Sequence, residues 1–291
     1  MQKERITIKA KDGALISALA CNRNEPSVRG LVLICHGFGE HSGSYHELME
    51  RLAAAGYASL IFDQRGHGEL SEPDHKKRKK RLGVIPGYQS FLDDIDDVTA
   101  EIRRRLPNVP LALYGHSMGG NIAANYLLSR AQDDFSCVIL ESPWFGLTNS
   151  PNSFVIGLAK VLGTLSPKFA IYNKLTHTDI TADEKQVGKI ASDPLYHNRI
   201  SMRMFAGIHK GCRYAVENAA RLSVPTLLAY AGGERIVSNP AIAAFHSACG
   251  PHVIAREYPS CHAIHNDSAK EKLYADIISF LNAHCLPEGL K

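Results

Sequence analysis

The chain has 291 residues, of which 45% are hydrophobic and 21% are charged. Its 33 Lys and Arg residues and 29 Asp and Glu residues give a formal net charge of +4. This composition predicts a globular protein with a sizeable core, and the mild charge argues against a general nucleic-acid-binding protein.

The sequence carries neither a membrane-spanning stretch nor a cysteine pattern. No apolar run reaches the roughly 18 residues that span a bilayer, and no apolar core follows the first charged residues as in a secretory signal. The seven Cys residues are scattered without a Cys-x-x-Cys pair, so neither a zinc ribbon nor a disulfide framework is indicated. We therefore expect a cytoplasmic protein with reduced thiols.

Short apolar runs alternate with helical patterns along most of the chain. A hairpin is predicted first, with strands at 5–10 and 14–20 around the turn Lys11-Asp12-Gly13. Later strands lack polar alternation, which is typical of strands buried on both faces, and are predicted at 30–35, 57–62, 111–115, 137–140, 224–231 and 252–258. Helices are predicted at 45–55, 88–106, 118–129, 240–248 and 268–284. This order predicts an α/β fold with a mostly parallel central sheet and helices on both faces.

The alternation stops between residues 144 and 205. This stretch has helical patterns at 154–165 and 167–174 but no apolar run typical of a sheet strand. We interpret 144–205 as an inserted helical cap over the carboxyl edge of the sheet. The core would then consist of two parts, 1–143 and 206–291.

The sequence Gly115-His116-Ser117-Met118-Gly119 lies between a predicted strand and a predicted helix. In a Gly-x-Ser-x-Gly turn the serine occupies a strained junction, and its small neighbours let the backbone turn without collision. The helix that follows directs its amino end toward the serine, where its dipole stabilises a developing oxyanion. We therefore predict that Ser117 is a catalytic nucleophile rather than an idle serine in a Gly-rich turn.

An oxyanion hole needs two backbone donors. One is expected to be the amide of Met118, the residue after the nucleophile. The other is expected from Phe38, because the glycines on both sides of it let the backbone approach a substrate oxygen closely. We interpret His36 as a structural residue that braces this loop rather than as a catalytic base.

Three longer motifs follow one another along the chain: HGFGEHSGSY at 36–45, FDQRGHG at 62–68 and GHSMGG at 115–120. In this order and spacing they resemble the monoglyceride lipase and lysophospholipase group of the α/β-hydrolases, as does SDPL at 192–195 in the predicted cap. The resemblance extends over about residues 6–281. It implies an α/β-hydrolase fold and a serine ester hydrolase that acts on a monoacyl lipid.

The resemblance also implies the other two members of a catalytic triad, which in this fold follow the serine in the order acid, then histidine. The acid is expected at Glu234, where the family usually has Asp, and the base at His262. A buried carboxylate in this role fixes the tautomer of the imidazole. Glu141 is the alternative acid, because some lipases of this fold carry theirs at the end of that earlier strand.

Glu40 and His265 match two of the polar residues with which the family binds the glycerol end of its substrate. For His265, a capping or solvated histidine at a helix start is an equally open interpretation. Ser44 and Ile190 replace two other polar members of the set, which weakens the expectation of strict monoacylglycerol specificity. Apolar residues of the cap are expected to form its own core and in part to line an acyl tunnel or a membrane-facing lip.

Three functions stay open at this point. The first is hydrolysis of a monoacylglycerol or lysophospholipid through an acyl-enzyme, and the second is hydrolysis of small soluble aryl or cinnamoyl esters. The third is a non-catalytic ligand receptor, against which the complete order of serine, acid and histidine argues. We expect a small-molecule lipid ester as substrate, no cofactor, no metal ion and no nucleic-acid partner.

One basic run, at 76–81, has six consecutive cations. We interpret it as a mobile, solvated loop. Weak peripheral contact with an anionic membrane surface is the alternative, because each cation near such a surface contributes about 1 kcal/mol.

Overall fold

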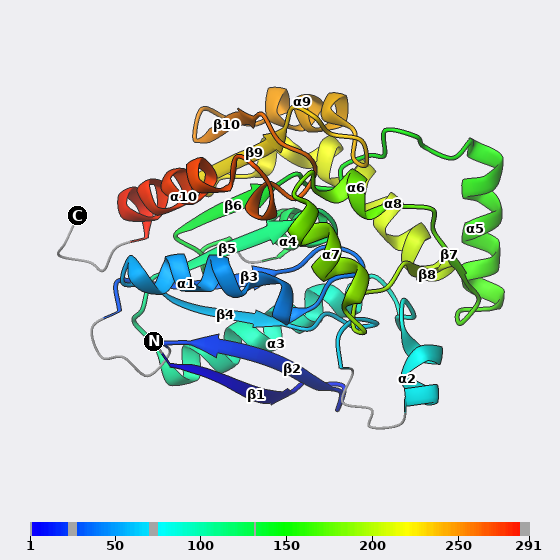
Figure 1. The fold of residues 1–291 in the computed structure, drawn as a ribbon, viewed down its shortest axis with the longest axis horizontal. Coiled ribbons are helices and arrows are strands. Elements are labelled where there is room, and N and C mark those ends of the chain that lie inside the picture. Colours follow the sequence, from blue (N-terminus) through cyan, green and yellow to red (C-terminus); the bar gives the residue numbers. More distant parts are fainter. Residues whose placement is uncertain (1, 23–27, 70–74, 131, 286–291) are drawn as a thin grey trace.

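The computed structural model describes residues 2–22, 28–69, 75–130 and 132–285, which surround an eight-stranded sheet (Figure 1). The strands are β1 (Lys3–Lys9), β2 (Leu15–Cys21), β3 (Leu31–Cys35), β4 (Ala58–Phe62), β5 (Leu111–His116), β6 (Cys137–Glu141), β9 (Thr226–Ala231) and β10 (Val253–Tyr258). Their spatial order is β1-β2-β4-β3-β5-β6-β9-β10. Strand β2 is antiparallel to β1 and β4, and the other neighbours run parallel. The predicted hairpin and mostly parallel sheet are confirmed.

Helices cover both faces of the sheet, because the central strands direct alternate side chains into two apolar layers. Along β3, Leu31 and Leu33 belong to one layer, and Val32 between them belongs to the other. The first layer includes α3 (Gln89–Arg105), α4 (Met118–Ser129), α8 (Met202–Asn218) and α9 (Asn239–Ala248). The second includes α1 (His46–Ala54) and α10 (Lys270–His284). The carboxyl ends of β5 and β6 are thereby fixed between two layers of helices.

Two of the helices depart from the sequence-based predictions. Helix α2 (His75–Arg81) contains the basic run, so the prediction of a loop there is wrong; Lys and Arg are good helix formers. Helix α8 was not predicted, since Gly207 and Gly211 interrupt its pattern. A Cβ at residue 207 would lie 2.8 Å from Tyr88 Cβ, so close packing explains the first of these glycines.

The segment between β6 and α8 contributes no strand to the central sheet. It contains the helices α5 (Ser153–Leu165), α6 (His177–Ile180) and α7 (Glu184–Ser192). It also contains two short antiparallel strands, β7 (Ala170–Tyr172) and β8 (Arg199–Ser201). The helix predicted at 154–165 is confirmed, but the one at 167–174 is wrong, because Ile171 and Tyr172 are strand formers that pair with β8. Figure 1 shows α5 at one edge of the molecule, beside β7, β8 and α8.

Within the described part of the chain, no helix combines the length and the apolar character needed to cross a membrane.

Candidate active site

Ser117 lies between β5 and α4, at the junction that its motif predicts. Its φ and ψ angles are 52° and −115°, a strained conformation for a residue with a side chain. A Cβ at residue 115 would lie 2.6 Å from the Gly119 carbonyl oxygen, which explains the glycine there. Helix α4 begins at Met118, so its unpaired amides and positive dipole end adjoin Ser117.

The Ser117 hydroxyl contacts a histidine and, through it, a carboxylate. His262 Nε2 lies 2.9 Å from Ser117 Oγ, and His262 Nδ1 lies 2.7 Å from Glu234 Oε2. The other Glu234 oxygen accepts hydrogen bonds from the next three backbone amides, at 2.8–3.2 Å. Burial raises the pKa of Glu234, but His262 and two of these amides outweigh it, so the pKa lies below its ordinary value. This arrangement allows a proton to pass from Ser117 to His262 while Glu234 stays a fixed anion.

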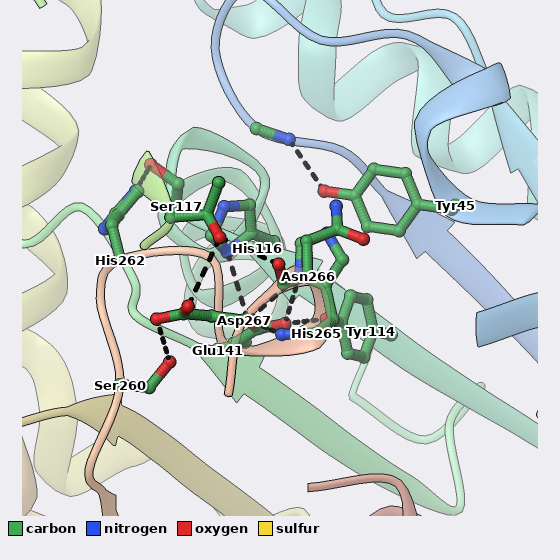
Figure 2. A network of polar contacts seen from close by, with 12 residues as sticks. Tyr45, Tyr114, His116, Ser117, Glu141, Ser260, His262, His265, Asn266 and Asp267 are labelled. Carbon is green, nitrogen blue, oxygen red and sulfur yellow. Dashed lines mark hydrogen bonds and ion pairs between the residues drawn. The ribbon is translucent and has the colours of Figure 1, made fainter. Parts of the chain in front are cut away.

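The carboxylate of Glu141, the alternative acid, is buried and has partners other than His262 (Figure 2). Its carboxylate accepts hydrogen bonds from the Tyr114 hydroxyl and from the His265 amide, the latter at 3.0 Å. His265 Nδ1 lies 3.0 Å from both carboxylate oxygens. Burial opposes protonation of His265, but Glu141 outweighs it and raises the pKa of His265. The structure thus pairs Glu141 with His265, and Glu234 with His262.

His116 lies between these two pairs. Its ring centroid is 4.9 Å from that of His262 and 4.9 Å from that of His265. Burial and these two neighbours hold the pKa of His116 well below its ordinary value. Among the described residues, His116, Glu141 and His265 place ligand atoms within 4.8 Å of one another, close enough for a metal ion. Glu141 contacts His265 Nδ1, whereas His265 Nε2 and His116 Nδ1 are buried without a hydrogen-bond partner in the described part of the chain. The expectation of an enzyme without a metal stays a prediction.

The loop that carries Phe38 is held by Glu40. Glu40 Oε2 accepts hydrogen bonds from Gly37 N at 2.7 Å and from the Tyr45 hydroxyl at 2.6 Å. The Tyr45 ring stacks on His265, with centroids 4.7 Å apart. Phe38 and Glu40 line the cavity that contains Ser117, whereas His265 does not. Binding of glycerol by Glu40 and His265 therefore stays a prediction, and both side chains form hydrogen bonds within the protein.

Three buried histidines support the same loop. His36 Nε2 accepts a backbone hydrogen bond at 3.0 Å and its Nδ1 lies 2.8 Å from the Gly37 carbonyl oxygen, which confirms that it braces the loop. The rings of His67 and His197 lie edge-on to Phe38. Burial lowers the pKa of all three histidines, to about 4 for His197. The loop thus rests on neutral rings at neutral pH.

The loop that carries His262 is held by Asp267, a residue that sequence reasoning missed. Asp267 Oδ2 accepts hydrogen bonds from the Cys261 amide at 2.6 Å and the Ser260 hydroxyl at 2.9 Å (Figure 2). Its Oδ1 accepts one from the Ala182 amide at 3.1 Å. The only signal was an Asp just before the last helix, which indicates a cap rather than a brace for His262.

Ser117, His262 and Glu234 open into a cavity of about 860 Å³, a size typical of small-molecule sites. Most of its wall is apolar and comes from the segment between β6 and α8 and from the first turn of α8. The apolar lining includes Leu147, Val155, Ile171, Leu175, Ile180, Ile200, Met202 and Phe205. An apolar group attached to a carbonyl carbon would be desolvated here beside the serine.

Fold and site together define the class: the chain is a serine hydrolase with the α/β-hydrolase fold. Residues 26–269 match the family described as "Serine aminopeptidase, S33", and the chain belongs to this family, within the group of monoglyceride lipases and lysophospholipases. The resemblance inferred from three motifs is confirmed.

Several relatives cover most of the chain. It is 30% identical to monoglyceride lipase of Mus musculus over 76% of this chain and 71% of the relative. It is 26% identical to a monoacylglycerol lipase of Mycolicibacterium smegmatis, over 88% and 89%. The crystal structure of Paleococcus ferrophilus monoacylglycerol lipase is 26% identical, with a TM-score of 0.79 over 97% of this chain and 98% of that one.

Proposed function

We propose that the protein hydrolyses the ester bond of a monoacyl lipid, a monoacylglycerol or a lysophospholipid, through an acyl-enzyme. The observation that carries this proposal is the relay from Ser117 through His262 to Glu234 at the floor of an apolar cavity. Two names among the relatives support the substrate class, monoacylglycerol lipase in Mycolicibacterium smegmatis and phospholipase YtpA in Bacillus subtilis.

In the first half-reaction, Ser117 Oγ attacks the ester carbonyl carbon while His262 Nε2 takes its proton. The negative oxygen that forms is stabilised by the amides of Phe38 and Met118 and by the amino end of α4. The tetrahedral intermediate then expels the alcohol, which takes the proton from His262. The products of this step are the free alcohol, glycerol or a glycerophosphodiester, and an ester between Ser117 and the fatty acid.

In the second half-reaction, a water molecule replaces the alcohol. His262 removes its proton as the oxygen attacks the acyl carbon, and then returns a proton to Ser117 Oγ as the fatty acid leaves. Glu234 stays ionised throughout, since its low pKa and three amide hydrogen bonds stabilise the anion. It therefore stabilises the imidazolium without accepting the proton.

A small soluble ester is the second candidate substrate. It is favoured by the loss of two of the family's usual glycerol-binding side chains, which Ser44 and Ile190 replace, and by the internal partners of Glu40 and His265. The large apolar cavity favours the lipid instead, because a short acyl group would leave most of the wall without a partner.

Two measurements test the proposal. A fluorophosphonate probe should label the wild-type protein but not Ser117→Ala, and absence of wild-type labelling would leave a non-catalytic receptor. Hydrolysis should then be compared across p-nitrophenyl esters of increasing chain length and a panel of monoacylglycerols and lysophospholipids. A maximum at acetyl, without release of fatty acid from any lipid, would assign the protein to the soluble esterases.

A further inference from the structure

A second concave site lies between α5 and α8, with a volume of about 600 Å³. We call it the cationic cleft because, among the described residues that line it, five side chains are basic and none is acidic. The basic residues are Lys160, Arg203, His209, Lys210 and Arg213. None of them lines the cavity that contains Ser117, so the cationic cleft is a separate site.

The sequence of α8 builds one wall of the cleft. Arg203, Lys210 and Arg213 recur at intervals that place them on one face of a helix. Between them, Ala206 and Gly207 are too small to fill the space, so the concavity is a consequence of the residue order. The opposite wall comes from α5, whose Lys160 lies on the same cleft.

One of the cations is fixed in place by the fold. Arg203 Nε donates to the Gly163 carbonyl at 2.9 Å, and its Nη1 donates to the Pro86 carbonyl at 2.7 Å. Both acceptors are uncharged, so the guanidinium keeps its full charge on the cleft. A preorganised cation of this kind loses little side-chain entropy when an anion binds.

The other basic side chains of the cleft have few acidic partners among the described residues. Arg213 pairs with Glu217 at 3.2 Å, and both side chains are exposed; neither Lys160 nor Lys210 forms an ion pair with a described residue. Burial, Lys160 and Arg213 together lower the pKa of His209, which agrees with a positive potential in the cleft. These cations lie close enough to repel one another, and a bound anion would offset that repulsion.

We propose that the cationic cleft binds a phosphate group, carried either by a small soluble molecule or by a lipid headgroup. Phosphate offers several oxygens to donors that converge from two helices, and both Arg forks and Lys ammonium groups suit it. On α5, the exposed apolar side chains of Val161 and Leu165 lie next in sequence to the cleft residues Lys160 and Thr164, where an attached acyl chain would contact them.

The test measures binding, not hydrolysis, and therefore does not depend on the proposed function. Inorganic phosphate is titrated into the protein by calorimetry at a constant ionic strength set with chloride. Vesicles of phosphatidylcholine, with and without a minority of phosphatidic acid, are used in a sedimentation assay. The test variant is K160Q/K210Q. The matched control is K185Q/K189Q, which removes two exposed cations from α7, in the segment that also contains Lys160.

We expect saturable phosphate binding, or binding to the phosphatidic acid vesicles, that is at least tenfold weaker in K160Q/K210Q and unchanged in K185Q/K189Q. Calorimetric binding alone identifies a soluble phosphate compound, whereas cleft-dependent vesicle binding alone identifies a lipid headgroup. An equal loss in both double variants, or no saturable binding in either assay, overturns the proposal. Ser117→Ala should bind phosphate as the wild type does, whatever the outcome for hydrolysis.

Discussion

The carboxylate of Glu141 and the imidazole of His265 form a fully buried pair, one histidine ring away from His262. His265 also stacks on Tyr45, whose hydroxyl donates to Glu40, and Glu40 accepts from the Gly37 amide. A continuous chain of contacts therefore runs from the Glu141 pair to the loop that carries Phe38. This relationship gives His265 and Glu40 a positioning role as an alternative to contact with a glycerol headgroup.

The two roles predict different kinetics for Glu40→Gln. If Glu40 positions the loop, kcat should fall by about tenfold or more for both a monoacylglycerol and a p-nitrophenyl ester of the same acyl chain, because both use the same oxyanion hole. If Glu40 instead binds the glycerol headgroup, only hydrolysis of the monoacylglycerol should be impaired, mainly through a higher KM. We expect the first pattern, measured as the ratio of kcat/KM for the two substrates.

Tyr45→Phe is the control for this prediction, since it removes the hydroxyl that donates to Glu40 with little change in volume. It should reproduce the pattern of Glu40→Gln in milder form. A glycerol-specific loss in Glu40→Gln, with Tyr45→Phe unchanged, would return Glu40 to the substrate-binding set.

The order of the elements and the nucleophile motif could be predicted from the sequence because their signals are local. Each central strand is an apolar run buried on both faces, and the turn around Ser117 needs glycines at fixed spacing. Side-chain partners across the fold have no such signal. Glu141 and His265 are 124 positions apart, and only the folded chain brings them together.

Helix α8 and strand β7 were not predicted because they too depend on contacts between residues that are distant in the sequence. The glycines of α8 lower its intrinsic helix propensity, yet a Cβ at residue 207 or 211 would lie within 3.0 Å of Tyr88, so packing requires both positions to lack a side chain. Strand β7 has three residues and exists through its pairing with β8, some thirty positions later. Tertiary contacts therefore decide the conformation in both segments.

Glu234→Gln tests which carboxylate serves His262. A neutral amide neither stabilises the imidazolium nor fixes its tautomer, so we expect kcat to fall roughly 10³–10⁴-fold. Glu234→Asp should show an intermediate loss, because the shorter side chain withdraws the carboxylate by about 1 Å from a site built around Glu. Initial rates on one p-nitrophenyl ester are sufficient for the comparison.

Glu141→Gln is the matched control for Glu234→Gln. It should lower the free energy of unfolding, since it removes the charged partner of buried His265, while retaining far more kcat than Glu234→Gln. Urea denaturation separates this loss of stability from a loss of catalysis. A greater loss of kcat in Glu141→Gln than in Glu234→Gln would transfer the role of the acid to Glu141.

Asp267→Asn tests the support of the His262 loop. Asp267 accepts hydrogen bonds from Ser260, Cys261 and Ala182, and an amide can replace only part of this set. We expect kcat to fall about a hundredfold with KM little changed, because His262 would be displaced by a fraction of an ångström to 1 Å. Full activity in Asp267→Asn would show that the loop holds its position without this carboxylate.

The histidines beneath Phe38 make stability depend on pH. Burial lowers the pKa of His36, His67 and His197 in the folded state, so the unfolded chain binds more protons once the pH falls below about 6.5. Their stabilising contribution is therefore complete above that pH and is lost as the pH falls toward the folded values, about 4 for His197. His265 has the opposite sign, because its raised pKa makes its contribution decline as the pH rises through the folded value.

His197→Asn should reduce this acid sensitivity. In the wild type, His197 Nδ1 accepts from the Arg199 amide at 3.3 Å, and its Nε2 lies 3.0 Å from the Gly66 carbonyl oxygen, an arrangement that suits the neutral ring. Asn keeps an acceptor near the Nδ1 position but does not titrate. Between about pH 7 and about pH 5, the variant should therefore lose up to about 2 kcal/mol less of its free energy of unfolding than the wild type does. Urea denaturation at the two pH values measures both changes, and equal changes in the two proteins would show that His197 is not one of the groups responsible.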